Sequence, residues 1–255
     1  MIDPFILNSK IDIPFVGAKV SVHQPTLKEI AYIGGQDVLF PGCELLRISK
    51  DIFTGNDKID SEYITDFDIL MQIILMHSPE LEKPIESAKL VLELLFPQHI
   101  VRWNPPFQIS LKQDDNISFI TKDNFEELKQ IIAEMFCLTR GSNTPDFNPL
   151  DERAAQIAEK IKQRYKKLAQ MRGESGNSSI FDRYISILAV GLQKDKNDLM
   201  EYSVYQLFDE FDRFQAKMAY DIYVQAKMAG AQDIEEVENW MKDLHSNGST
   251  NDFYV

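Results

Sequence analysis

The sequence predicts a mainly α-helical protein of the α+β class, and three observations indicate this class. Apolar residues recur at helical spacing along much of the chain, most sharply from residue 202 to residue 233. Alternation typical of β-strands is limited to short stretches in roughly the first 120 residues. The chain has 255 residues, of which 44% are hydrophobic and 26% charged, a composition that supports one large or two small cores.

The first elements are a predicted β-hairpin or pair of short strands within residues 5–25, followed by a short helix. Apolar and polar residues alternate in the stretch KVSVHQ, and Gly17 marks a turn. Thr26 and Glu29 have the spacing of a capping box, and the Gly-Gly pair at 34–35 ends the helix. Three further helices are predicted around residues 43–48, 64–77 and 85–96.

The middle of the chain predicts two or three short strands and one well-capped helix. The strands are expected at 100–103, 107–111 and 116–120, which are rich in Ile, Val and aromatic residues and too short for helices. The helix is expected over 121–136, with Thr121 as its N-cap. Its apolar face would contain Phe125, Leu128, Ile131, Ile132 and Met135.

A segment rich in Gly, Ser, Asn and Pro, residues 138–152, predicts a domain border near residue 145. We therefore expect an α+β domain over 1–145, a helical domain over 146–245 and a disordered tail over 246–255. Limited proteolysis should cut first in the border segment. The helices of the second domain are expected at 151–171, 180–190, 202–233 and 234–244.

The long helix after residue 202 has two apolar lines. With side chains advancing by about 100° per residue, the first line is expected to enter a core. It contains Val204, Leu207, Phe208, Phe211, Phe214, Met218, Ile222 and Ala229. The second line contains Tyr202, Tyr205, Ala216, Tyr220 and Tyr223. Its tyrosines either pack inside the helical domain or form a partner-binding surface, since a tyrosine presents an apolar ring and a hydroxyl that tolerates water.

Charge and composition limit the classes of partner. The net charge of −13 and the pI of about 4.8 oppose broad binding to nucleic acid or to anionic membranes. A basic run at 159–172 is expected to be the solvated face of an amphipathic helix. Two distant cysteines, Cys43 and Cys137, suggest neither a disulfide framework nor a zinc site and fit a reducing cytosol. No signal peptide or membrane-spanning stretch is recognisable.

Signatures of catalysis or cofactor binding are missing from the sequence. The four histidines, His23, His77, His99 and His245, are scattered, and no pair has metal-ligand spacing. The glycine-containing stretch at 34–42 lacks the lysine and hydroxyl residue of a phosphate-binding loop. Clustered carboxylates lack the spacing of a calcium loop. We therefore expect a protein that is not an enzyme and that holds neither a cofactor nor a metal.

The order of several segments resembles the tail assembly chaperones of tailed phages that infect Gram-positive bacteria. The resemblance extends from about residue 18 to residue 245 and is strongest in VYQLFDEFDRF, which precedes YDIYVQAKMAGA and then Trp240. Its other segments are KVSVHQPTLKEIAYIGG, ITKDNFEELKQIIAEMF, DFNPLDERAAQIAEKI and SIFDRYISILAVG.

This resemblance implies a non-catalytic role in the host cytoplasm. Such a protein binds the tape measure protein while tail tube subunits polymerise around it, and is then absent from the mature virion. Tail tube subunits and a second copy of the chain are further partners to consider. Two alternatives stay open at this point: a permanent tail or baseplate component, and an enzyme whose site is assembled only by the fold.

Overall fold

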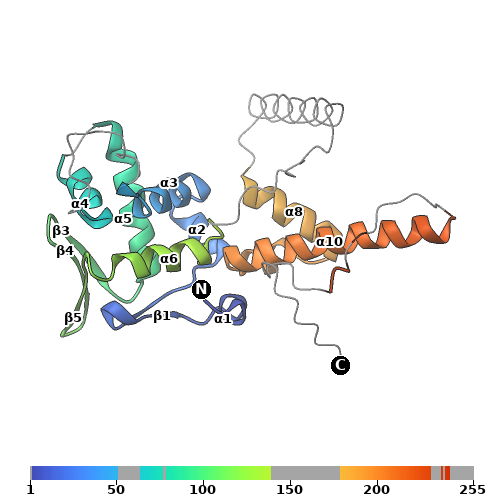
Figure 1. Ribbon diagram of the computed structural model, residues 1–255, viewed down its shortest axis with the longest axis horizontal. Helices are drawn as coiled ribbons and strands as arrows, with labels where there is room; N and C mark the ends of the chain where they lie inside the picture. Colours follow the sequence, from blue (N-terminus) through green and yellow to red (C-terminus); the bar gives the residue numbers. More distant parts are fainter. Residues whose placement is uncertain are drawn as a thin grey trace.

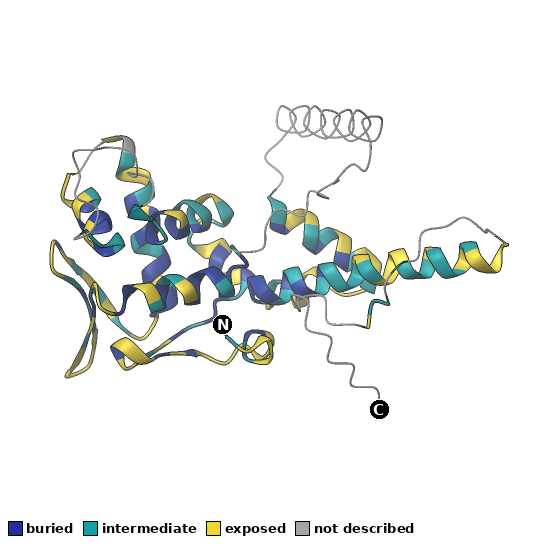
Figure 2. Ribbon diagram, viewed as in Figure 1, coloured by how far each residue is buried: buried dark blue, intermediate teal, exposed yellow. Residues whose placement is uncertain are grey.

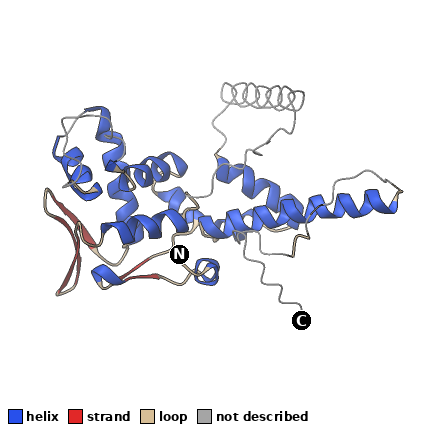
Figure 3. Cartoon of the chain, viewed as in Figure 1, coloured by secondary structure: helices blue, strands red, loops and turns tan. Residues whose placement is uncertain are grey.

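A computed structural model describes residues 2–50, 64–76, 79–138, 179–230, 237 and 239–241 (Figure 1). The predicted domain border near residue 145, the predicted helix at 151–171, the basic run and the tail lie outside these residues. Within them the protein is mainly helical, with two small antiparallel sheets in the N-terminal half (Figure 3). The predicted fold class is confirmed.

The N-terminal segment contains a helix where the sequence pattern predicted strands. Helix α1 spans Pro4–Ser9, where the side chain of Asp3 caps the amide of Phe5. Strands β1 (Ile13–Phe15) and β2 (Val20–Val22) then form the predicted hairpin around the short 3-10 helix η1 (Val16–Ala18). The strand prediction is wrong for α1 because Asp3 and the proline after it define a helix start that the apolar residues alone do not reveal.

Helix α2 (Leu27–Tyr32) has the predicted capping box. Helix α3 (Gln36–Leu46) begins well before the predicted start at residue 43 and contains Pro41 in its interior. Pro41 and Gly42 are unfavourable inside an isolated helix, but packing against helix α5 outweighs this local preference. Helices α4 (Asp66–Met76), η3 (Pro79–Leu81) and α5 (Glu82–Leu95) follow.

The larger sheet consists of strands β3 (Ile100–Asn104), β4 (Gln108–Gln113) and β5 (Asn116–Ile120), in the order β3-β4-β5. One face contributes Ile109, Leu111 and Ile120 to the core. The opposite face is exposed, as an antiparallel sheet allows (Figure 2). All three predicted strands are confirmed to within two residues at each end.

In helix α6 (Phe125–Met135) the N-cap position is occupied by Asn124, whose side chain makes no hydrogen bond to the helix, so the prediction of Thr121 as N-cap is wrong. The Asn124 side chain accepts a hydrogen bond from the Thr121 amide and donates to the carbonyls of Gly17 and Phe119. Asn124 therefore joins the hairpin, the sheet and α6. A side chain at Gly17 would collide with Asn124, because a Cβ there would lie 2.5 Å from the Asn124 Cβ.

The C-terminal part contains helices α8 (Ile180–Leu192), α9 (Lys196–Met200) and α10 (Val204–Met228). The short helix α9 was not predicted. The start of α8 is attached to α3, since Gln36 Oε1 accepts hydrogen bonds from the Ser179 hydroxyl at 3.1 Å and the Ile180 amide at 2.9 Å. The rings of Phe40 and Phe181 also meet there, with centroids 5.5 Å apart.

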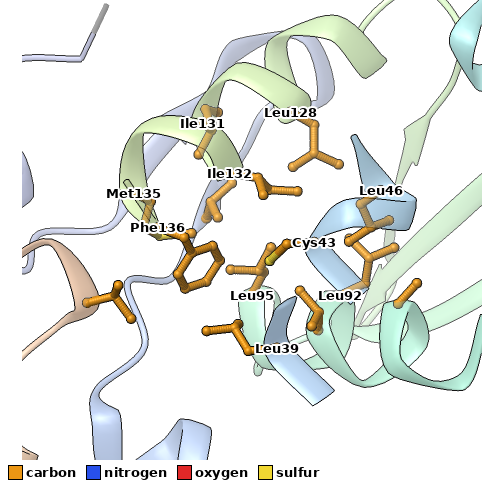
Figure 4. Packing of buried hydrophobic residues seen from close by; sticks show 14 of the residues in the cluster. Leu39, Cys43, Leu46, Leu92, Leu95, Leu128, Ile131, Ile132, Met135 and Phe136 are labelled. Atoms are coloured by element: carbon orange, nitrogen blue, oxygen red, sulfur yellow. The ribbon is translucent and has the colours of Figure 1, made fainter. Parts of the chain in front are cut away.

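The hydrophobic core is one cluster that contains residues from both sides of the predicted domain border. Its centre lies between α3, α5 and α6, where apolar side chains of the three helices point toward one another (Figure 4). Cys43 lies in this centre, and burial raises the pKa of its thiol. The C-terminal helices add Phe181, Leu188 and Leu207 to the same cluster.

A largely buried ion pair joins α4 to α6. The Lys129 ammonium donates to Asp66 and, at 2.9 Å, to the exposed Glu126. Burial raises the pKa of Asp66, but the hydrogen bonds from Lys129 and from the Lys50 amide outweigh it and hold this pKa below its ordinary value of 3.8. Because the folded-state pKa is depressed, the stabilisation is present above about pH 4 and is lost as pH falls through the folded pKa.

We predict that Asp66→Asn lowers the free energy of unfolding at pH 7 by about 1 to 2 kcal/mol, because Lys129 loses its buried partner. The difference from the wild type should shrink below about pH 4, where Asp66 becomes protonated first in the unfolded chain and then, at lower pH, in the folded protein. Urea denaturation at a series of pH values measures both effects. The control Glu126→Gln removes an exposed partner and should change little; an equal loss in the two variants would contradict the assignment.

Candidate protein-binding surface

Helix α10 begins at a rigid junction with the N-terminal half of the chain. Ser203 is its N-cap and forms a capping box with Gln206. Ser203 also pairs with Thr26, the N-cap of α2, and the Leu27 amide donates to the Tyr202 carbonyl at 2.8 Å. Two helix starts are thus hydrogen-bonded to each other, which fixes the direction in which α10 leaves the core.

The first part of α10, residues 204–214, is packed against the rest of the protein, and we call it the packed half. It contains the buried residues Val204, Tyr205, Leu207, Asp209 and Phe211. Helix α10 contacts α8, α1 and α6. Because neighbouring helices cover it on more than one side, an apolar surface on two sides is needed here for packing alone.

Helix α8 covers the apolar stripe of the packed half as far as Phe214. The ring of Tyr184 stacks on Phe211 with centroids 3.8 Å apart and meets Phe208 edge-on at 5.3 Å. Near the end of α8, Gly191 leaves room for the Phe214 ring, since a Cβ at this glycine would lie 2.3 Å from the ring. One residue later α8 ends, while α10 continues.

The second part of α10, residues 215–228, contains no buried residue, and we call it the free half (Figure 2). In Figure 1 it extends beyond α8 and away from the core. Met218 and Ile222 continue the apolar stripe of the packed half, yet their side chains are 46% and 62% exposed. The prediction that these two residues enter the core of the chain is therefore wrong.

The apolar residues of the free half form one wide face. At about 100° per residue they span an arc of about 240°, which also contains Gln215, the first residue of the free half, and Lys227, near its end. Along this arc lie Met218, Ile222, Ala226, Ala219, Tyr223, Ala216, Tyr220 and Val224. The same side of the helix is buried in the packed half. The free half thus has an apolar face of the kind found in cores. Among the described residues, no helix covers it.

The tyrosines of the free half contact each other, and the charges around them are few. The rings of Tyr220 and Tyr223 are 6.4 Å apart, and the Lys227 ammonium lies 5.7 Å from the Tyr223 ring. Lys217 forms an ion pair with Asp221 at 3.5 Å on the polar side of the helix. Partly buried aromatic rings beside aliphatic side chains are common at protein interfaces.

The structure divides the four tyrosines that the sequence suggested as partner-binding residues. Tyr205 is buried in the core with 5% of its surface exposed. Tyr202 precedes the helix, is partly buried, and its hydroxyl accepts a hydrogen bond from Lys194 at 2.6 Å. Tyr220 and Tyr223 are half-buried on the free half. Met218 and Ile222, which their spacing assigned to a core, lie on the free half together with Tyr220 and Tyr223.

No described group of three or more His, Cys, Asp or Glu residues has the arrangement of a metal site. A shallow hollow of about 600 Å³ lies between α3, α5 and α8, with Asp37 as its carboxylate. Its other lining residues are Gln36, Phe40, Pro41, Lys83, Ile180 and Arg183. His23 is elsewhere, between Asp12 at 3.2 Å and Glu29 at 3.3 Å, and His99 packs edge-on against Phe96. Burial lowers the pKa of His99.

Comparison with known proteins gives one match. The family model described as the YomV second domain matches residues 177–245, which include α8, α9 and α10. No curated protein and no solved structure matches the chain. YomV is a phage-associated family name, so the match associates the C-terminal part of the chain with a phage protein. None of the helices that the structure describes is long and apolar enough to cross a membrane.

Proposed function

We propose that the protein is a non-catalytic phage tail assembly chaperone that binds the tape measure protein in the host cytoplasm and assists polymerisation of the tail tube. The observation that supports this role best is the free half of α10. Its apolar face is of the kind that a core buries, and it extends away from the body of the protein. A permanent apolar surface of this kind is typical of a protein-binding site.

The net charge suits a chaperone of an aggregation-prone client. At −13 the chain repels other copies of itself and of its complexes, which keeps them dispersed. The phage association of the YomV second-domain match and the resemblance to tail assembly chaperones support the same role. Tail tube subunits are further proposed partners.

Co-expression with the tape measure protein of the same phage tests the proposal. A soluble complex recovered through a tag on this chain is the expected result, and a tape measure protein that stays insoluble and uncaptured would contradict it. Mass spectrometry of purified virions gives a second readout. A chaperone should be absent from the particles, whereas stoichiometric presence would identify a structural tail component.

A further inference from the structure

The apolar face of the free half is the continuation of a helix-helix interface that already exists in the protein. Helix α8 packs on this side of α10 through Tyr184 and Gly191, and the contact ends at Phe214. The next residues of the same stripe, Met218 and Ile222, are exposed. The apolar residues of this surface recur at the spacing that helices use to pack against one another. They continue along α10 beyond the end of α8.

Given the client-binding role proposed above, we propose that the occupant is a basic amphipathic α-helix of the partner protein, which packs along the free half in the place where α8 would continue. The free half is about 21 Å long at 1.5 Å per residue, so it accommodates about two heptads of a partner helix. An extended strand would find no free backbone groups on a helix with which to pair.

The net charge of the whole chain sets the sign of the partner helix. The free half itself holds Lys217 and Asp221, which pair with each other, and Lys227, which lies over Tyr223, so its own charges sum to +1 and do not favour a basic partner. The whole chain has a net charge of −13. Its long-range field therefore attracts a helix with lysine or arginine beside the apolar seam and repels an acidic one.

The composition of the face favours recognition of amphipathicity over recognition of one sequence. Met218 has a flexible thioether side chain that adapts to differently shaped partners. Tyr220 and Tyr223 offer flat rings with polar ends. An interface of about two heptads is also short, so binding should be reversible. Reversibility is what a chaperone that later leaves its client requires.

Binding of synthetic peptides to the full-length protein tests this inference. The probe is a peptide of about three heptads with leucine at positions a and d and lysine or glutamine elsewhere. A peptide of the same composition in scrambled order tests attraction by charge alone, and the seam peptide with a central proline tests the need for a helix. A version with glutamate in place of lysine tests the sign of the charge.

Matched protein variants locate the site. Met218→Gln with Ile222→Gln removes the exposed stripe and keeps helix propensity and charge unchanged. Ile100→Gln with Ile117→Gln makes the same kind of change on the exposed face of the sheet, where these residues are 58% and 52% exposed. Strands β3 and β5, which contain these two residues, lie at the end of the molecule opposite the free half (Figure 1).

We expect the lysine seam peptide to bind the wild type and the sheet variant equally, and to bind the α10 variant at least about tenfold more weakly. Equal binding of the scrambled or proline peptide would overturn the inference of a helix, and stronger binding of the glutamate peptide would overturn its basic charge. Equal binding by the α10 variant would overturn the site. If the wild type captures the tape measure protein but not the seam peptide, the helix inference fails and the proposed function stands.

Discussion

Replacing Tyr205 with alanine should lower the free energy of unfolding by about 3 to 4 kcal/mol, because the ring is buried in the core beside α10's other packed residues. A cavity remains where the ring was, and the surrounding helices close it only in part. For a chain of this size the loss corresponds to a fall in melting temperature of about 2 to 4 °C per kcal/mol. Thermal and urea unfolding of the purified variant measure the effect.

Tyr223→Ala is the matched control within the same line of tyrosines. Its ring lies on the free half, where it meets the Tyr220 ring and the Lys227 side chain. We expect a loss below about 1 kcal/mol, as for most surface substitutions. If Tyr223→Ala were as destabilising as Tyr205→Ala, the division of α10 into a packed half and a free half would be wrong.

Gly42→Ala should destabilise the protein by about 2 kcal/mol, because α3 and α5 approach each other closely at this residue. A Cβ at Gly42 would lie 2.7 Å from the Ser87 carbonyl oxygen and 2.7 Å from a methyl group of Val91. A backbone carbonyl within a helix cannot turn away, so the two helices must separate. Alanine also raises helix propensity by about 1 kcal/mol, which offsets only part of this strain.

Gly191→Ala provides the comparison. It makes the same change in a helix, but the atoms in the way belong to the ring of Phe214, a side chain that can rotate. We expect the strain and the gain in helix propensity nearly to cancel, so that the melting temperature stays close to that of the wild type. A larger loss at Gly191 than at Gly42 would contradict this assignment of the tight contact to α3 and α5.

Local patterns were sufficient to predict most helices and strands. The capping box at Thr26, the alternation around β2 and the periodicity of α10 depend on neighbouring residues, and each is present in the structure. Helix α3 was predicted too short: Pro41 and Gly42 are locally unfavourable in a helix, and contact with α5 stabilises them there. Such tertiary contacts are not visible in sequence spacing.

The candidate site shows the same limit. Periodicity placed Phe211 and Met218 on one stripe, as the structure does. It could not show that α8 ends beside Phe214. Because α8 ends there, Phe211 is buried and Met218 is exposed. The tyrosine line was likewise recognised, but burial of Tyr205 depends on the position of neighbouring helices. An apolar residue on a helix indicates that something should cover it, and only the fold shows whether the same chain does so.

Capture of the tape measure protein by a Tyr220→Ser, Tyr223→Ser double variant tests the central claim most directly. Each ring lost from an interface commonly costs on the order of 1 to 2 kcal/mol of binding free energy, so capture should fall at least about tenfold. The melting temperature should stay close to that of the wild type, because both rings lie outside the core. Unchanged capture, or a variant that melts far earlier, would contradict the assignment of the free half of α10 as the client-binding surface.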